Sequence, residues 1–180
     1  METERARLLA ERLHANDYEE DGTALLEHVR RVAGRVDADV KAVAWLHEVL
    51  EWTAVAEREL LEDGLDSDEL RALRLLYRAP AARAGGANPY LAHVAYLAHV
   101  GLIARAAGRS GRLARLVKSV DLRDRCLHPR VRAGGWSPPY ADGLALLMHH
   151  DAAGPPPVGQ IALAQRRSSV RRPDLLQGAG

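Results

Sequence analysis

Four residues of the kinds that bind metal ions are spaced along the sequence, each inside a stretch with a helical pattern: His28, His47, Glu48 and Asp121. One imidazole, an adjacent imidazole and carboxylate, and a distant carboxylate can close around a single divalent cation. This ligand set suits Mn²⁺ first, with Zn²⁺ and Fe²⁺ as alternatives. Four protein ligands in an octahedral shell leave two positions for water and substrate oxygens, so the pattern predicts a hydrolytic metal centre.

Each of these residues also has an ordinary structural explanation. A single histidine on a helix is more often a core or surface residue than a ligand. Glu48 alone would be a solvated charge, and Asp121 alone would pair with a neighbouring arginine. The surrounding sequence favours the metal, because the segment around His47 is the most apolar of the chain and buried charges need partners or a metal ion.

Further residues near these positions could act on a substrate. Glu51 lies one helical turn after His47, which makes it the candidate general base or water-positioning group, with a helix salt bridge as the alternative. Trp52 either belongs to the core or lies at a pocket rim, where it could stack on a nucleobase. Three cationic residues could neutralise phosphate charge, although each arginine also fits a surface position: Lys118, Arg123 and Arg125.

The elements that must position these residues are all expected to be helices. Apolar residues recur at helical spacing, the composition is rich in good helix formers, and no segment has a convincing strand pattern. The sequence therefore predicts an all-α bundle of about seven to eight helices in one domain, residues 1–152, followed by a flexible Pro/Arg-rich tail, residues 153–180. The expected helices cover residues 2–14, 24–35, 40–54, 56–63, 68–78, 89–107, 112–125 and 137–150.

Composition narrows the class of protein. The chain has 180 residues and a formal net charge of only +1. Arginine carries nearly all of its positive charge, and together with the abundant alanine this looks like a genome-wide base composition. We therefore do not read the arginines as a nucleic-acid signature and expect no nucleic-acid partner. Cys126 is the only cysteine, which favours a reducing cytoplasm. We expect no signal peptide and no membrane span. The expected partner is a small phosphorylated molecule or nucleotide. The sequence leaves open whether the protein forms a homodimer.

Three short motifs resemble the HD-domain metal-dependent phosphohydrolases of the RelA/SpoT type. The segments are 26–29 around the first histidine, 47–53 with the His-Glu dyad, and 117–122 with the late aspartate. The similarity runs over residues 5–128 in the order of the family's elements. It implies an HD-like helical bundle, a divalent metal held by the four residues above, and hydrolysis of a phosphorylated nucleotide such as (p)ppGpp.

The chain departs from that family's pattern at several positions. The second residue of the HD dyad is Glu48, the second acid of the HDxxED motif is replaced by Trp52, and the asparagine after the late aspartate by Arg125. The family has a basic pair before the turn that corresponds to Asp21-Gly22, and this chain has Glu19-Glu20 there instead. Because the acidic pair, the asparagine and the basic residues support catalysis and nucleotide binding in the family, two other hypotheses remain. One is a degenerate HD protein that binds metal or nucleotide without turnover, and the other is a purely structural helical protein.

Overall fold

The computed structural model describes residues 1–19, 22–78, 88–127 and 140–153. Within these ranges the only β-type pairing is an isolated bridge between Tyr18 and Ala24, and every longer element is a helix. The expected all-α fold is therefore confirmed. The tail predicted over 153–180 lies outside the described residues, apart from Ala153 at the end of the last helix.

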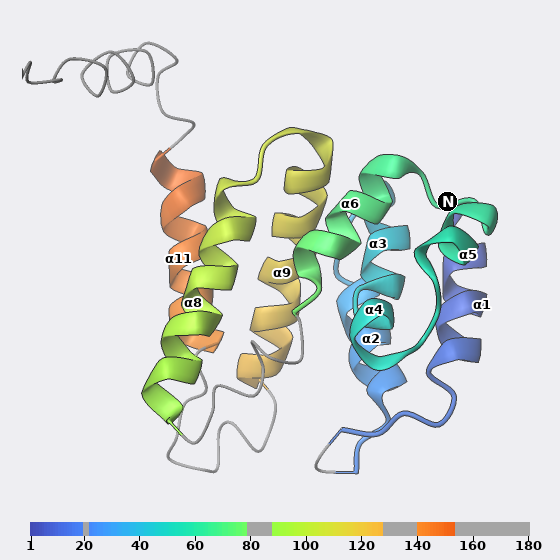
Figure 1. Ribbon diagram of the computed structural model, residues 1–180, viewed down its shortest axis with the longest axis horizontal. Helices are drawn as coiled ribbons and strands as arrows, with labels where there is room; N and C mark the ends of the chain where they lie inside the picture. The colour runs from blue at the N-terminus through green and yellow to red at the C-terminus, as the bar shows by residue number, and fades with distance from the viewer. Residues whose placement is uncertain (20–21, 79–87, 128–139, 154–180) are drawn as a thin grey trace, which may run out of the picture.

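The described helices follow one another along the chain as Figure 1 labels them. The N-terminal half contains α1 (Thr3–Leu13), α2 (Leu25–Ala33), α3 (Lys41–Leu46), α4 (Val49–Trp52), α5 (Glu57–Glu62) and α6 (Ser67–Leu76). The C-terminal half contains α8 (Pro89–Arg105), α9 (Gly108–Leu127) and α11 (Tyr140–Ala153). Most bounds lie within a few residues of those expected from the sequence.

Local capping explains where several helices begin and end. Helix α6 starts with a complete capping box, in which the Asp66 side chain accepts from two backbone N–H groups and the Glu69 side chain accepts from the backbone of Asp66. The cap is thus Asp66, and the helix begins at Ser67, one residue before the expected range of 68–78. Asn88 caps α8 in a similar way. Helix α5 ends just before Gly64, whose φ of +97° favours glycine.

The prediction of one continuous helix over residues 40–54 is wrong at its centre. Helix α3 ends at Leu46, and α4 begins at Val49, so His47 and Glu48 form a turn between two helices. Both residues keep right-handed helical backbone angles, and the chain direction therefore changes little. The imidazole of His47 bonds back to the carbonyl of Ala44, at 2.8 Å from Nδ1.

The expected break over residues 108–111 is also shorter than predicted, because α9 already begins at Gly108. Gly108 has a φ of +73°, which makes the turn out of α8. Gly111 lies inside α9, where a Cβ atom would clash with the carbonyl of Ala106. Glycine here therefore permits the close approach of the link after α8 to the first turns of α9.

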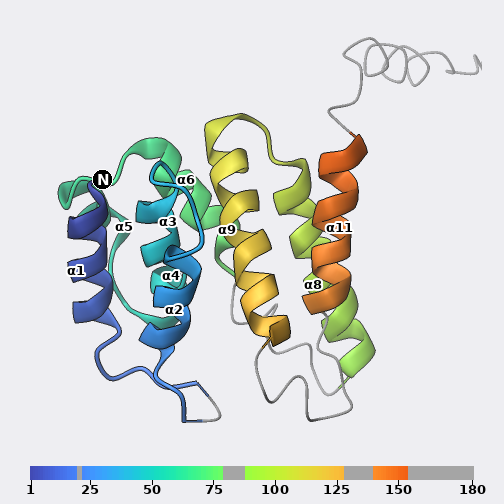
Figure 2. The same cartoon turned by 180° about the vertical axis from the view of Figure 1, so that it is seen from behind.

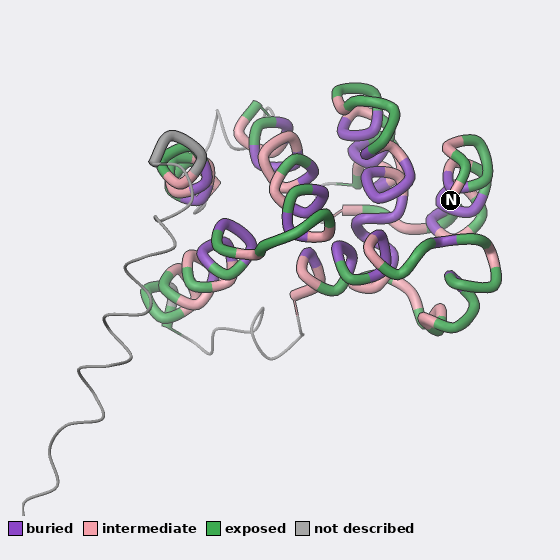
Figure 3. The backbone as a smooth tube through the Cα atoms, turned by 90° about the horizontal axis from the view of Figure 1, so that it is seen from above, coloured by how far each residue is buried: buried purple, intermediate pink, exposed green. Residues whose placement is uncertain are grey.

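Helix α9 lies in the middle of the bundle and contacts both halves of the chain. Helices α2, α3 and α6 pack on it from the N-terminal half, and α8 and α11 from the C-terminal half (Figures 1 and 2). Seen from above, buried residues lie on the helix sides that face one another (Figure 3). Among the described helices, none is both long and apolar enough to cross a membrane. The central helix carries Asp121 and can bring it to residues of the N-terminal half.

Candidate metal centre

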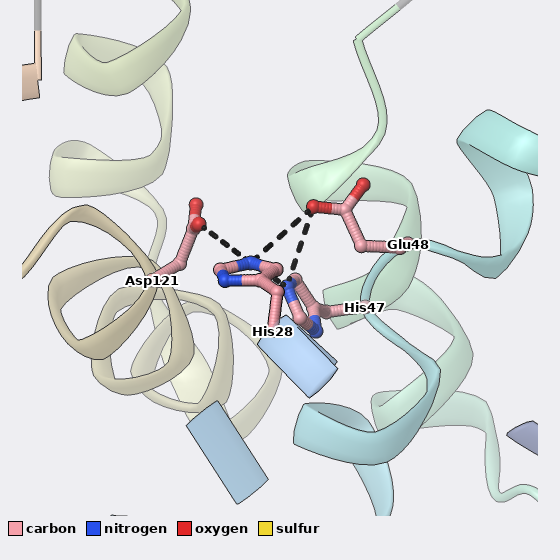
Figure 4. A group of neighbouring side chains, drawn as sticks. All are labelled: His28, His47, Glu48 and Asp121. Carbon is pink, nitrogen blue, oxygen red and sulfur yellow. Dashed lines mark hydrogen bonds and ion pairs between the residues drawn. The ribbon is translucent and has the colours of Figure 1, made fainter. Parts of the chain in front are cut away.

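The four predicted ligands meet in the interior of the bundle. One side-chain atom from each of them lies within 4.8 Å of the other three (Figure 4). The Nε2 atom of His28 is 3.3 Å from Nε2 of His47, 3.2 Å from Oδ1 of Asp121 and 3.7 Å from Oε1 of Glu48. The same Glu48 oxygen is 3.4 Å from Nε2 of His47. Residues that are far apart in the sequence thus form one compact group.

Three separate elements supply these side chains. His28 comes from α2, His47 and Glu48 from the turn between α3 and α4, and Asp121 from α9 (Figure 4). All four residues are buried. His47 and Glu48 are adjacent and keep helical backbone angles, which direct neighbouring side chains about 100° apart, and both side chains nevertheless reach the group from the turn between α3 and α4 (Figure 4).

The outer nitrogen of each imidazole faces an oxygen acceptor, which leaves the inner nitrogen to bind a metal ion when the ring is neutral. Nδ1 of His47 faces the carbonyl oxygen of Ala44 at 2.8 Å, and Nδ1 of His28 faces Oδ2 of Asp124 at 2.9 Å. When each imidazole is neutral with its ring proton on Nδ1, both Nε2 atoms offer lone pairs inward. Two imidazole nitrogens and two carboxylate oxygens would then present four lone pairs to a cation, whose binding displaces any proton on Nε2.

The spacing of these atoms fits a divalent ion. In an octahedral shell with bonds of about 2.1 Å, neighbouring ligand atoms lie about 3.0 Å apart and opposite ones about 4.2 Å apart. The four separations given above, between 3.2 and 3.7 Å, are close to the shorter value. Both histidines also carry the outer-shell hydrogen bond that orients metal-binding imidazoles. The residues present could thus hold a divalent metal ion.

Two half-buried cations lie against the carboxylates of the group. Nζ of Lys118 is 2.7 Å from Oδ2 of Asp121, and Arg125 donates to both Asp121 and Glu48. Burial alone would raise the pKa of each carboxyl, but the charge of Arg125, joined at Asp121 by that of Lys118, holds both pKa values below their ordinary range. Both acids are therefore ionised, as metal ligands must be.

Asp124 is a further functional residue that the sequence did not single out. Its carboxylate accepts from His28 and also pairs with Arg31 and Arg35 on the N-terminal side of the bundle. Burial and the position of Arg125 lower the pKa of His28, but its hydrogen bonds to Asp121 and Asp124 outweigh them and raise it. One signal in the sequence could have found Asp124, since it follows Asp121 by about one helical turn and so shares its face.

The remaining predicted site residues differ in their placement. Trp52 is 39% exposed and its indole N–H donates to Oε2 of Glu48 at 3.1 Å, so it lies at the edge of the group rather than in the core. Glu51 is half-buried on α4 and is not one of the four converging residues. Arg123 is exposed on α9. Their predicted roles with a substrate stay predictions.

Two tyrosines border the cationic side of the group. The rings of Tyr96 on α8 and Tyr140 on α11 meet edge to face, with centroids 6.0 Å apart. The ammonium of Lys118 lies over the first ring and the guanidinium of Arg125 over the second, 5.8 and 5.9 Å from the centroids. Burial raises the pKa of Tyr96 to about 12, so its phenol stays protonated. The sequence analysis did not identify either tyrosine.

Comparisons with known proteins add no relative to this picture. No protein-family model matches the chain, and no curated protein matches it. The functional argument therefore depends on the geometry of the buried group and on the motifs in the sequence.

Proposed function

We propose that this protein is a divalent-metal-dependent phosphohydrolase that acts on a nucleotide or a related phosphorylated small molecule. One observation carries the proposal: four buried side-chain atoms of metal-binding type, from His28, His47, Glu48 and Asp121, converge within 4.8 Å of one another. Lys118 and Arg125 pair with the two carboxylates, and a divalent ion would join the same carboxylates to the two imidazole nitrogens. Mn²⁺ is the ion we favour, because the set combines two nitrogens with two carboxylate oxygens.

The chemistry follows from the residues around the group. When bound, a divalent ion supplies Lewis-acid activation of water and of a phosphoryl oxygen. Lys118 and Arg125 place two positive charges beside the same carboxylates, where they can offset the charge of a phosphate. Glu51 remains our candidate for positioning the attacking water and accepting its proton, and Trp52 for contact with a nucleobase.

The family proposal is an HD-domain protein of the RelA/SpoT type in the cytoplasm. It is supported by the order of the three motifs along the chain and by the all-α fold in which their ligands meet. Pyrophosphate hydrolysis of a (p)ppGpp-like nucleotide is the reaction that this resemblance suggests first. Because Trp52 and Arg125 replace residues of the family's catalytic pattern, the substrate is best sought in a panel of nucleotides rather than in a single compound.

A second candidate function is binding of metal or nucleotide without turnover. The contacts of Arg125 and Trp52 favour it, because both residues bond to oxygens of Glu48. A site whose carboxylate is held in this way can bind a ligand and report its presence while lacking the acid needed for hydrolysis.

The test is a calorimetric titration of metal-stripped protein with Mn²⁺. We expect one ion per chain in the parent protein and no measurable binding in His47→Ala. His93→Ala is the matched control, since His93 is half-buried on α8 and pairs with Asp142 outside the group. Release of phosphate or pyrophosphate from a nucleotide panel that includes guanosine tetraphosphate then separates the two functions. Binding with turnover supports the hydrolase, binding without turnover supports the second candidate, and no binding contradicts both metal proposals.

A further inference from the structure

Arg125 contacts three carboxylates at once. It lies one turn after Asp121 on α9, and its Nε atom is 2.7 Å from Oδ1 of Asp121. Its Nη2 atom is 2.5 Å from Oε1 of Glu48, and its Nη1 atom is 3.1 Å from Oε1 of Glu19. The guanidinium therefore bridges α9, the turn between α3 and α4, and the segment that precedes α2.

The oxygens that Arg125 occupies are the ones that converge on the histidines. Oδ1 of Asp121 and Oε1 of Glu48 are the carboxylate oxygens that pair with Nε2 of His28, at 3.2 and 3.7 Å. Lys118 and Trp52 instead bond to the outer oxygens, Oδ2 of Asp121 and Oε2 of Glu48. Of the side chains that the described contacts place on the two carboxylates, Arg125 is thus the cation on the inner pair.

We propose that Arg125 and a divalent metal ion are alternative occupants of this inner oxygen pair, an inference that rests on the proposed function. Two cations that share the same oxygens in a buried group repel each other, since the protein interior screens charge poorly. Lys118 can stay in place, because it uses the outer oxygen of Asp121. Arg125 is the group that moves when the metal binds.

The structure gives the displaced side chain somewhere to go. The Arg125 side chain is 23% exposed, while those of Glu48 and Asp121 are 8% and 3% exposed, so Arg125 has more access to solvent than the two carboxylates it contacts. A free guanidinium beside a metal ion forms a bidentate contact with a phosphate. Phosphate binding would thus hold Arg125 away from the carboxylates, and we infer that metal and phosphate strengthen each other's binding.

The experiment is a Mn²⁺ titration of metal-stripped protein, with and without inorganic phosphate, in the parent protein and Arg125→Gln. Without phosphate, we expect Arg125→Gln to bind Mn²⁺ at least about tenfold more tightly, in the range of ordinary coupling between sites. Phosphate should raise the Mn²⁺ affinity of the parent protein and change that of the variant little. Arg112→Gln is the matched control, because it removes an exposed, ion-paired arginine from the same helix and should leave the affinity unchanged.

Loss of Arg125 leaves buried carboxylates without a partner and can destabilise the metal-free protein. Circular dichroism therefore accompanies each titration, and Arg125→Lys serves as a second variant. A lysine keeps the charge but lacks the planar fork that reaches two oxygens, so it should also bind Mn²⁺ more tightly than the parent protein.

The outcomes separate this inference from the proposed function. Equal or weaker Mn²⁺ binding in both folded variants would overturn the competition while leaving the metal site standing. Binding in the variants but not in the parent protein would support the competition and indicate that Arg125 blocks the native site. No binding in any of the proteins would overturn the inference and the metal-dependent function together.

Discussion

Nδ1 of His28 on α2 lies 2.9 Å from Oδ2 of Asp124 on α9, and this contact turns the other ring nitrogen toward the converging ligands. The same carboxylate pairs with Arg31 and Arg35, which fix it from the side of α2. The ring of His28 is therefore oriented by a residue that has no place in the group itself. Such outer contacts commonly decide how well an imidazole binds a metal.

Replacement of Asp124 by Asn should weaken metal binding without removing a ligand. The amide cannot offer the negative charge that polarises the imidazole of His28, so we expect the affinity for Mn²⁺ to fall by about 10- to 100-fold. Calorimetry of metal-stripped protein measures this loss. Asp39→Asn is the control, since Asp39 is an exposed acid paired with Arg112. An unchanged affinity in Asp124→Asn would show that the contact has no influence on the metal.

The two neighbouring ligands of the turn should respond differently to substitution. Glu48→Asp keeps a carboxylate one methylene further from the ion, and we expect Mn²⁺ affinity within about tenfold of the parent value. His47→Ala removes a buried nitrogen ligand and should abolish measurable binding. Glu59→Asp makes the same chemical change at an exposed position on α5. Equal loss at Glu48 and His47 would mean that the ion is held differently, and no loss at either would place it elsewhere.

The sequence predicted the identity of the converging residues because each ligand type stood in an apolar, helical stretch. It could not predict the turn at His47 and Glu48, since both residues keep helical backbone angles and no proline or glycine marks the interruption. The turn depends on tertiary packing, in which α3 is covered by α1, α2 and α6.

The contacts around the ligands could not be predicted from the sequence either, because they too depend on tertiary packing. Asp124 and Arg125 were visible as charges on a helix, but their partners lie on segments that are distant in the sequence. Only the docking of α9 against α2 decides that one carboxylate orients a histidine and one guanidinium covers two ligands. Spacing within a helix contains no information about that docking.

The capping box of α6 should make stability depend on pH. Burial raises the pKa of Asp66, but hydrogen bonds from Glu69 and Asp68 N–H and from Arg109 lower it further than burial raises it, so the folded protein favours the ionised form. That contribution is present above the unfolded pKa of about 3.9 and is lost as the pH falls through the folded value. The free energies of unfolding of the parent protein and Asp66→Asn should therefore converge in acid, as urea titrations at several pH values would reveal.

Asp66→Ala provides the comparison for this experiment. Alanine accepts no hydrogen bond at the N-cap, so we expect a loss of about 1 kcal/mol near neutral pH, more than in Asp66→Asn, which retains an acceptor. A difference between the parent protein and Asp66→Asn that did not shrink with falling pH would contradict the assigned role of the carboxylate.

Two glycines of the C-terminal half should respond in opposite directions to alanine. In Gly111→Ala the new methyl group would clash with the backbone carbonyl of Ala106, so the turn into α9 must shift, at a cost of about 1–3 kcal/mol or more. In Gly101→Ala the methyl group would meet only the flexible end of Arg105, and the gain in helix propensity should be about 0.5–1 kcal/mol. Thermal unfolding compares the two, and similar effects of both changes would refute the close approach at Gly111.

The ligands come from α2, the turn before α4 and α9, so the complete site can form only late in the synthesis of the chain. A growing chain that has released only its first two ligand segments lacks Asp121 and also the acid that orients His28. A metal ion held by the complete group would therefore bind only after α9 has been synthesised. A bound ion would then link α2, the turn before α4 and α9 after these elements have packed together, and it would resist the separation of the two halves of the chain.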